Sequence, residues 1–395
     1  MHLFVNYNSY KEPLLNSGLM THELLKEKIS TITNQKKIEV KIAGYSAQHR
    51  EIYQLSVGRG PIPVMLWSQM HGDEPTGTRA FFDLFNFLQA DDEHNDFRQL
   101  IFNHCTLHFI PMLNPDGAEL NERRNAQGID INRDFLQQQS PEAQLLTRLH
   151  QQIQPAFGFN MHDQEALWSV AGTKQPASIS LLAPPADDLA LVSPSRLKAM
   201  QLVAGINGIL SSIIPGYVGK WSETFEPHAF GDNFQRLGTS TLLIEAGGYP
   251  GDAERQFVRE LNFKILLYAL EQITTAGYQH HSITAYHQIP QNVKELFHLL
   301  IKNVILPTPA GIIRVDIGLN HSHSFDAVPL QHQALYAIQD IGDLSTYNAY
   351  QTIDVQGYEF AHALSLGSLA NFTVIDALNN TYSFQNGQLF FIRKT

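Results

Sequence analysis

A histidine and a glutamate three residues apart could form part of a metal site. In segment 68–80, SQMHGDEPTGTRA, His71 and Glu74 follow an apolar run, and a second histidine, His162, follows the apolar run 156–161. Two imidazoles and one carboxylate are a ligand set of catalytic zinc sites, where water takes the fourth position. Zinc held only by nitrogen and oxygen ligands can lower the pKa of that water to about 7. These residues therefore predict one zinc ion with a catalytic role.

A further carboxylate, Glu245, lies at the end of the apolar run 240–246. With three ligands already assigned, Glu245 is predicted to remain unliganded beside the water. Each of these side chains alone is more often structural or solvated than functional. All four, however, lie where a predicted buried strand ends, and this shared position favours a single site.

The elements around these residues are typical of an α/β fold. Between about residues 60 and 275, short apolar runs bounded by turn residues alternate with helical patterns, which indicates a mostly parallel sheet. In such a sheet the carboxyl ends of the strands meet in one crevice, which would bring the four side chains together. The expected strands are 62–70, 106–113, 156–161 and 240–246, and the expected helices are 77–90 and 253–273.

The two ends of the chain have a different texture. Residues 1–60 look like an N-terminal segment with one helical stretch followed by alternating strands. Near residue 280 the pattern changes to a short helical piece at 293–302 and then to β-like runs punctuated by glycine and proline. We expect a first domain over 1–280 that includes the N-terminal segment, and a smaller β-rich domain over 285–395.

A second motif block, residues 112–135, contains three arginines. It opens with the turn sequence NPDG (114–117) and continues with Arg123, Arg124 and Arg133. An arginine can stabilise a developing oxyanion or clamp a carboxylate through two parallel hydrogen bonds. Composition alone favours the other interpretation, a solvated face with ion pairs to the acidic residues of the same block.

Composition limits the partners. The 395-residue chain has 27 basic and 38 acidic residues, a net charge of -11 and no basic block, so nucleic acid is not an expected partner. No run of eighteen apolar residues occurs, so no membrane association is expected. Cys105 is the only cysteine, and the first residues lack a secretory pattern, so we expect a cytoplasmic protein.

The order of motifs HGDE, NPDG, RRN, DINRDF, MHD and IEAGG, over about residues 40–275, resembles the M14 family of zinc carboxypeptidases. The resemblance implies an α/β/α sandwich with a mixed, largely parallel eight-stranded sheet. It implies one Zn²⁺ ion on His71, Glu74 and His162, with Glu245 as general base and acid.

The resemblance also gives the arginines roles. Arg123, two residues before Asn125, matches the arginine that polarises the scissile carbonyl, with Arg124 as the fallback. Asn132 and Arg133 match the pair that grips the terminal carboxylate of the substrate. The resemblance therefore replaces the solvated interpretation for two of the three arginines.

The sequence departs from the family in several places. The mobile tyrosine expected some twenty residues before the base has no counterpart, because no tyrosine lies between residues 218 and 244. Phe230 lies near the spacing of the residue that governs side-chain preference and suggests an apolar pocket. Asp163 and Gln164 could support the metal ligands, but a solvated turn is the favoured interpretation. The β-rich C-terminal part matches no family that we can name.

The leading hypothesis is a zinc metallocarboxypeptidase, a hydrolase that acts on peptides with a free C-terminal carboxylate. One alternative is a zinc deacylase of N-acyl amino acids, similar to succinylglutamate desuccinylase and aspartoacylase, although NPDG followed by RRN favours the peptidase. Amidases of cell-wall peptides are a further option, disfavoured by the lack of a signal peptide. A non-catalytic binding protein on a peptidase fold is opposed by the complete set of ligands, base and arginines. The oligomeric state is not predicted.

Overall fold

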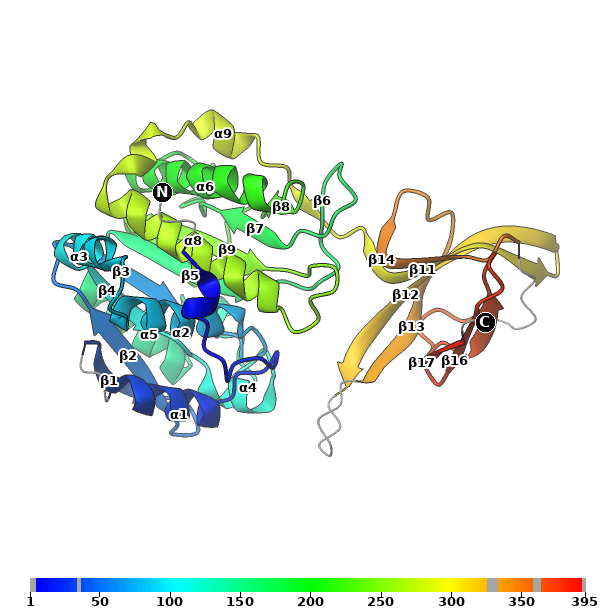
Figure 1. The fold of residues 1–395 in the computed structure, drawn as a ribbon, viewed down its shortest axis with the longest axis horizontal. Coiled ribbons are helices and arrows are strands. Elements are labelled where there is room, and N and C mark those ends of the chain that lie inside the picture. The colour runs from blue at the N-terminus through cyan, green and yellow to red at the C-terminus, as the bar shows by residue number, and fades with distance from the viewer. Residues whose placement is uncertain (1–4, 34–36, 325–332, 358–363, 393–395) are drawn as a thin grey trace. The chain divides into compact units, whose positions relative to one another are not determined.

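The computed structural model describes residues 5–33, 37–324, 333–357 and 364–392. The chain divides into two compact units, Met1–Asn292 and Val293–Thr395, which are described separately (Figure 1). Within the described ranges, every helix is too short or too polar to cross a lipid bilayer.

The first unit is built on a mixed eight-stranded sheet in the order β1-β2-β4-β3-β5-β9-β7-β8. Parallel pairs join β3 to β4 and to β5, β5 to β9, and β7 to β8, whereas β1-β2, β2-β4 and β7-β9 are antiparallel. The predicted class, α/β with a mixed, largely parallel sheet of eight strands, is confirmed. The strands are β1 (Glu39–Tyr45), β2 (Glu51–Val57), β3 (Ile62–Trp67), β4 (Cys105–Ile110), β5 (Phe157–Asp163), β7 (Ile179–Leu182), β8 (Val218–Lys220) and β9 (Ser240–Ala246).

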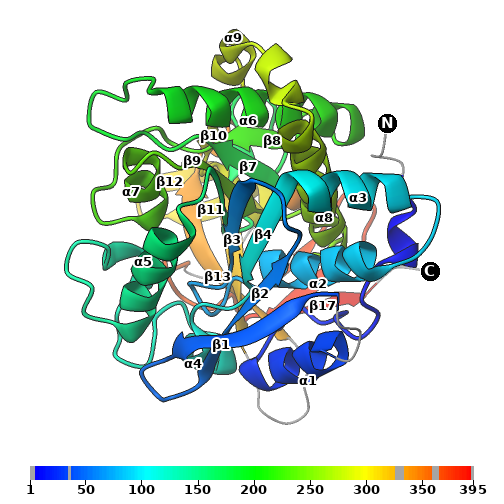
Figure 2. The same ribbon diagram turned by 90° about the vertical axis from the view of Figure 1, so that its left-hand side faces the viewer.

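Helices cover both faces of this sheet because its central strands are apolar on both sides. On β3, Val64 and Leu66 belong to one buried cluster and Met65 and Trp67 to the other, as alternating side chains require. Figure 2 shows α5 and α7 on one side of the sheet, and α2, α3 and α8 on the other. The helices are α1 (His22–Thr33), α2 (Thr76–Gln89), α3 (Asn95–His104), α4 (Pro115–Leu120), α5 (Pro141–Ile153), α6 (Pro194–Ile213), α7 (Phe230–Arg236), α8 (Gln256–Thr274) and α9 (Ile283–His287).

The four predicted strands that carry the chemistry correspond to β3, β4, β5 and β9, and the two predicted helices correspond to α2 and α8. Strands β1 and β2, predicted within the N-terminal segment, extend the same sheet at one edge. The two strands at this edge are antiparallel, so they do not contribute to the crevice at the carboxyl ends of β3, β5 and β9.

A buried ion pair fixes the start of the chain to two helices. Asp83 of α2 pairs with Arg259 of α8, and both side chains are fully buried. The Asp83 carboxylate also accepts hydrogen bonds from the Tyr7 hydroxyl (3.0 Å) and the Glu12 backbone N–H (2.7 Å). Arg259 in turn donates to the backbone carbonyls of Leu15 and Glu12. The segment before α1 therefore supplies partners that two buried charges need.

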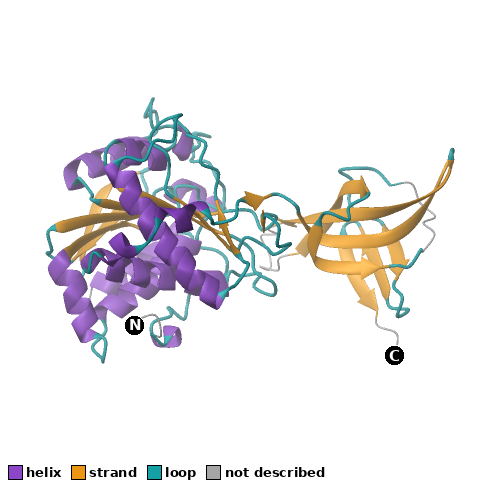
Figure 3. Cartoon of the chain, turned by 90° about the horizontal axis from the view of Figure 1, so that it is seen from above, coloured by secondary structure: helices purple, strands orange, loops and turns teal. Residues whose placement is uncertain are grey.

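In its described residues the second unit consists of strands, in contrast to the helices and strands of the first (Figure 3). One sheet has the order β13-β12-β11-β14 and the other the order β15-β16-β17. The strands are β11 (Leu296–Thr308), β12 (Gly311–Ser324), β13 (Gln333–Gly342), β14 (Asn348–Asp354), β15 (Phe372–Ile375), β16 (Thr381–Gln385) and β17 (Gln388–Ile392). The two-residue strands β6 (Ser169–Val170) and β10 (Asn292–Val293) pair with each other.

The helix predicted at 293–302 is wrong, because most of this segment belongs to β11. Its apolar run pairs with β12 on one side and with β14 on the other, and Leu299 and Ile301 are fully buried in the core of the unit. A short apolar run fits either type of element, and here the partner strands decide. The predicted hairpin turn is confirmed: Asn386 and Gly387, both with positive φ, join β16 to β17.

Candidate active site

His71 and Glu74 lie on the loop between β3 and α2, at the carboxyl end of β3. The loop packs against the NPDG turn, where the Asn114 side chain accepts a hydrogen bond from the Gly117 N–H (2.9 Å). A Cβ atom at Gly72 would lie 2.0 Å from the carbonyl carbon of Gly117, so only glycine fits at this contact. The turn that begins α4 therefore supports the loop that carries two of the predicted ligands.

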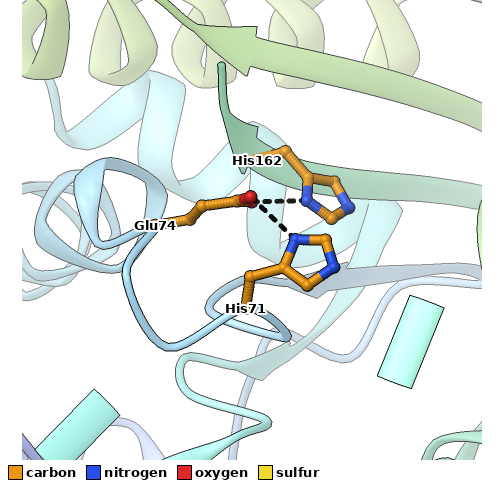
Figure 4. Close-up of side chains that lie close together, drawn as sticks. All are labelled: His71, Glu74 and His162. Carbon is orange, nitrogen blue, oxygen red and sulfur yellow. Dashed lines mark hydrogen bonds and ion pairs between the residues drawn. The ribbon is translucent and has the colours of Figure 1, made fainter. Parts of the chain in front are cut away.

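The three predicted ligands converge. His162 is the last residue but one of β5, and its Nδ1 atom lies 2.6 Å from Glu74 Oε2. His71 Nδ1 lies 2.7 Å from Glu74 Oε1. One ligand atom from each residue lies within 4.8 Å of the other two, and all three side chains are buried. Figure 4 shows the Glu74 carboxylate facing both imidazole rings.

The hydrogen bonds of His71 show that these residues fit a metal cation. Its Nε2 atom lies 3.0 Å from Asp130 Oδ1, so each ring nitrogen faces a carboxylate. A neutral imidazole has one N–H, which leaves the other nitrogen with a lone pair. If Nε2–H donates to Asp130, either a second proton or a cation must lie between Nδ1 and Glu74. A carboxylate on the outer nitrogen is the usual arrangement of a metal-binding histidine.

The charges around the triad agree with this interpretation. Burial opposes protonation of His71, but the Glu74 carboxylate and the hydrogen bond to Asp130 raise its pKa to about 9 in the chain without an ion. Burial also opposes ionisation of Glu74, yet the two histidines hold its pKa well below the usual range. The pKa of His162 is lowered by burial, which favours the neutral imidazole that a metal needs.

Arg123 extends into this site and Arg124 does not. Arg123 Nη1 lies 3.1 Å from Glu74 Oε1, while its Nε and Nη2 atoms lie 3.1 and 3.0 Å from Asp130 Oδ2. Asp130 thus holds both His71 and Arg123. Arg124 instead donates to the carbonyl of Gly128 (3.0 Å). Of the two arginines left open by the sequence, the geometry selects Arg123.

Glu245 lies beside the triad on the neighbouring strand. In the parallel pairing of β5 and β9 it is directly opposite His162. Its side chain is buried and, among the described residues, its carboxylate has no hydrogen-bond donor. Burial first, and then the charge of Glu74, raise the pKa of Glu245 well above its usual value. Such a carboxylate is a strong proton acceptor once a nearby cation restores its charge.

Asn132 and Arg133 lie on one short 3-10 helix, residues Ile131–Arg133. The Asn132 side-chain oxygen accepts a hydrogen bond from the Phe230 N–H (3.0 Å), which ties it to the start of α7. Arg133 is half-exposed, and its Nε lies 3.6 Å from Glu226 Oε2. Glu226, which the sequence did not indicate, therefore lies beside the arginine predicted to bind a carboxylate.

All of these groups border a single cavity of about 650 Å³. Its walls contain the triad, Glu245, Arg123, Asn132 and Arg133, so the structure brings together every site residue that the sequence predicted. Two half-buried tryptophans, Trp168 and Trp221, also line it, with ring centroids 5.0 Å apart. The cavity is also lined by Asn160, Asp163, Leu182, Pro184, Glu226, Gly231, Asp232, Leu243 and Arg255.

Two sequence interpretations are wrong. Phe230 does not line the cavity: it is fully buried against Phe135 and Phe234. Asp163 is not in a solvated turn, because its side chain is buried and accepts a hydrogen bond from the Thr76 hydroxyl (2.7 Å). The segment expected to carry a mobile tyrosine contributes Trp221, Ser222, Thr224 and Phe225 to the cavity instead.

Arg255, also not indicated by the sequence, joins the ends of the two strands that carry His162 and Glu245. It donates to the carbonyls of Gln164 (2.9 Å) and Ala246 (2.6 Å). It also lies 3.4 Å from Asp163. Gln164 itself is buried and donates to the carbonyl of Ala177, so it too is not part of a solvated turn.

Part of the chain is similar to known proteins. Residues 25–178 match the family of zinc carboxypeptidases, Peptidase M14. Carboxypeptidase SOL1 of Arabidopsis thaliana is 28% identical over 148 residues, 35% of this chain and 30% of that protein. Carboxypeptidase D of Drosophila melanogaster is 30% identical over 122 residues, 26% of this chain and 8% of that protein. The chain therefore spans less than a third of the length of these curated relatives.

Solved structures show the same fold. A metallo-carboxypeptidase from Burkholderia cenocepacia superposes with a TM-score of 0.52 and 15% identity, over 65% of this chain and 70% of that one. Bovine thrombin-activatable fibrinolysis inhibitor, solved in complex with tick carboxypeptidase inhibitor, gives a TM-score of 0.50 and 13% identity, over 68% of this chain and 98% of that one. Residues 25–178 are thus similar to M14 zinc carboxypeptidases, and the chain shares the fold of the solved carboxypeptidases.

Proposed function

We propose that this protein is a zinc-dependent metallocarboxypeptidase that hydrolyses the C-terminal amide bond of peptides. The observation that carries the proposal is the arrangement of the triad: Nδ1 of His71 and Nδ1 of His162 both face the Glu74 carboxylate, with Asp130 behind His71. The family match and the fold support it. A Zn²⁺ ion held by these residues would supply a Lewis acid for the scissile carbonyl and make water a better nucleophile.

The residues of the chain itself then move the proton and stabilise charge. Glu245 accepts the proton of the attacking water and passes it to the leaving amine, which is general base and then general acid catalysis. Its position opposite His162 keeps it beside the reacting carbonyl. Arg123 is held by Asp130 and lines the cavity, where its guanidinium can donate to the negative oxygen of the tetrahedral intermediate.

Asn132 and Arg133 make the reaction specific for the end of a peptide. A guanidinium binds a carboxylate through parallel hydrogen bonds, and Arg133 borders the same cavity as the triad. Binding the terminal carboxylate fixes which amide bond reaches Glu245. The substrate is therefore a peptide with a free C-terminal carboxylate.

Metal content and turnover of the purified protein test the proposal. We expect about one equivalent of zinc, release of the C-terminal residue from short peptides, and loss of activity on chelation that added zinc reverses. The same peptides with an amidated C-terminus should resist hydrolysis, because they lack the carboxylate. Hydrolysis of N-acyl amino acids in preference to peptides would instead support the deacylase. A protein that turns over neither substrate class would support the non-catalytic alternative.

A further inference from the structure

The loop between β7 and α6, residues 183–193, presents apolar side chains to solvent. Leu189 is 78% exposed, Leu191 59% and Val192 48%. Single exposed apolar side chains are normal on a protein surface, but a group of them marks an interaction site. None of the three lines the cavity described above. A substrate bound in that cavity therefore does not account for their exposure.

The backbone of this loop is held by two side chains. The Asp187 carboxylate accepts hydrogen bonds from the N–H groups of Leu189 (3.0 Å) and Leu191 (3.3 Å). The buried guanidinium of Arg196, on α6, donates to the carbonyl of Ala190. The leucines thus extend from a fixed backbone, so a partner that binds them does not have to order the loop.

The starts of α6 and the end of α7 extend the apolar surface. Val192 and Leu197 lie one residue before and four residues after the N-cap of α6, positions whose side chains are neighbours at a helix start. Ser195 accepts a hydrogen bond from the Gln235 side chain (2.8 Å), which brings the end of α7 to the start of α6. Leu237, the C-cap of α7, is exposed like Leu197. We call these exposed residues the α6 patch: Leu189, Leu191, Val192, Leu197 and Leu237.

Charged side chains of both signs border the α6 patch. Asp187 and Asp188 come just before its first leucine, whereas Lys198 and Arg236 adjoin its last two leucines. Asp188, Lys198 and Arg236 are exposed, and among the described residues none of these three has an ion-pair partner. A surface with acids beside one part and bases beside another is complementary to itself when a second copy is turned about a two-fold axis.

We propose that the α6 patch is the interface of a symmetric homodimer, in which Asp188 of one protomer faces the partner's Lys198. The apolar side chains of the two protomers pack at the centre, and the charged side chains form the rim. An anionic lipid surface is a poorer partner, because two acids adjoin the most exposed leucine. The interface uses no catalytic group, so it is independent of the carboxypeptidase function proposed above.

Sedimentation velocity of the full-length protein tests the interface. We expect a dimer that forms with rising concentration between about 1 and 100 µM, a range typical of modest apolar interfaces. Leu191→Ser should raise the dissociation constant at least ~10-fold, because it removes an apolar side chain from the centre. The matched control is Leu14→Ser, which alters an exposed leucine outside the patch and should not change the constant.

Three outcomes of this measurement would overturn the proposal. A wild type that stays monomeric over the whole range has no such interface. A dimer that is equally strong in Leu191→Ser uses another surface. A complex whose mass is not twice that of the chain contains a different partner.

A charge exchange separates pairing from folding. Asp188→Lys and Lys198→Glu should each weaken the dimer at least ~10-fold, because each places like charges opposite one another at both ends of the interface. When the two variants are mixed in equal amounts, opposite charges face each other again, and association should return to within a few-fold of wild type. Glu93→Lys, which reverses an exposed acid elsewhere, should have no effect. Altered folding of either variant cannot produce such a recovery, and a mixture that stays monomeric would overturn the pairing.

Discussion

His162 and Glu245 are directly opposite each other on the adjacent parallel strands β5 and β9. Neighbouring strands lie about 4.8 Å apart, so the spacing of the proposed ligand and the proposed base is set by backbone pairing and not by a loop. Arg255 joins the ends of the same two strands through two backbone carbonyls. The proposed base is therefore positioned by the pairing of two central strands.

Replacing Glu245 with glutamine tests the base. The amide has the same shape but cannot accept the proton, so kcat should fall by at least ~10²-fold, in line with general-base contributions. Zinc content should stay the same, because Glu245 is not a proposed ligand. Glu93→Gln, which alters an exposed acid, serves as the control. Near-normal turnover by Glu245→Gln would show that another group takes the proton.

The two neighbouring arginines provide a matched pair. Arg123→Gln should lower kcat by ~10² to 10³-fold, as removal of an oxyanion donor does. Arg124→Gln should stay within a few-fold of wild type, since Arg124 is bonded to the Gly128 carbonyl. Steady-state kinetics on one peptide would distinguish them. A larger loss with Arg124→Gln would contradict the assignment of Arg123.

Asp130→Asn tests the support behind the first ligand. The substitution keeps the shape of the side chain but weakens its hold on His71, so zinc affinity should fall by about 10 to 100-fold. Competition with a chromophoric chelator would measure this change. Because Asp130 also pairs with Arg123, kcat of the zinc-saturated variant should fall as well. Unchanged affinity would mean that His71 is positioned by its loop alone.

Stability should depend on pH through His150, which lies on α5 and does not line the cavity. Its ring stacks on Phe234 (centroids 3.9 Å apart), its Nε2 lies 2.8 Å from Thr239 Oγ1, and burial lowers its pKa to about 4. A lowered histidine pKa stabilises the folded state above the unfolded pKa of about 6.5, and this stabilisation is lost as pH falls toward 4.

Between pH 7 and pH 5 the contribution of His150 to the free energy of unfolding should fall by up to about 2 kcal/mol. Denaturant unfolding of the wild type and of His150→Gln at both pH values would measure it. The variant should be less stable at pH 7 but lose less on acidification. Equal losses in the two proteins would mean that His150 remains accessible to protons.

The central sheet and the ligands could be predicted because local signals and topology agree. Strands β3, β5 and β9 are short apolar runs, and the proposed ligands and base lie at or just after their ends. A parallel arrangement was therefore sufficient to bring His71, Glu74 and His162 together. Motif order then selected Arg123, and its contacts with Asp130 and Glu74 agree with that choice.

The residues of α7 that line the cavity could not be predicted, because the direction of a side chain on such a short helix depends on packing. Phe230 has the expected spacing, but α7 turns it toward Phe135 and Phe234 and leaves Gly231 and Asp232 at the cavity. The prediction of a helix at 293–302 was wrong for a related reason. Its apolar run has no clear period of its own, and strands β12 and β14, distant in sequence, determine its conformation.

The buried pair of Asp83 and Arg259 sets a limit on how far this protein can be shortened. The family match begins at residue 25, which would suggest that everything before it is dispensable. Yet the Tyr7 hydroxyl, the Glu12 backbone and the Leu15 carbonyl satisfy these two charges. Cutting at the boundary of similarity would leave two ions in the interior short of partners. The smallest stable form of the first unit therefore extends past the residues that the family model matches.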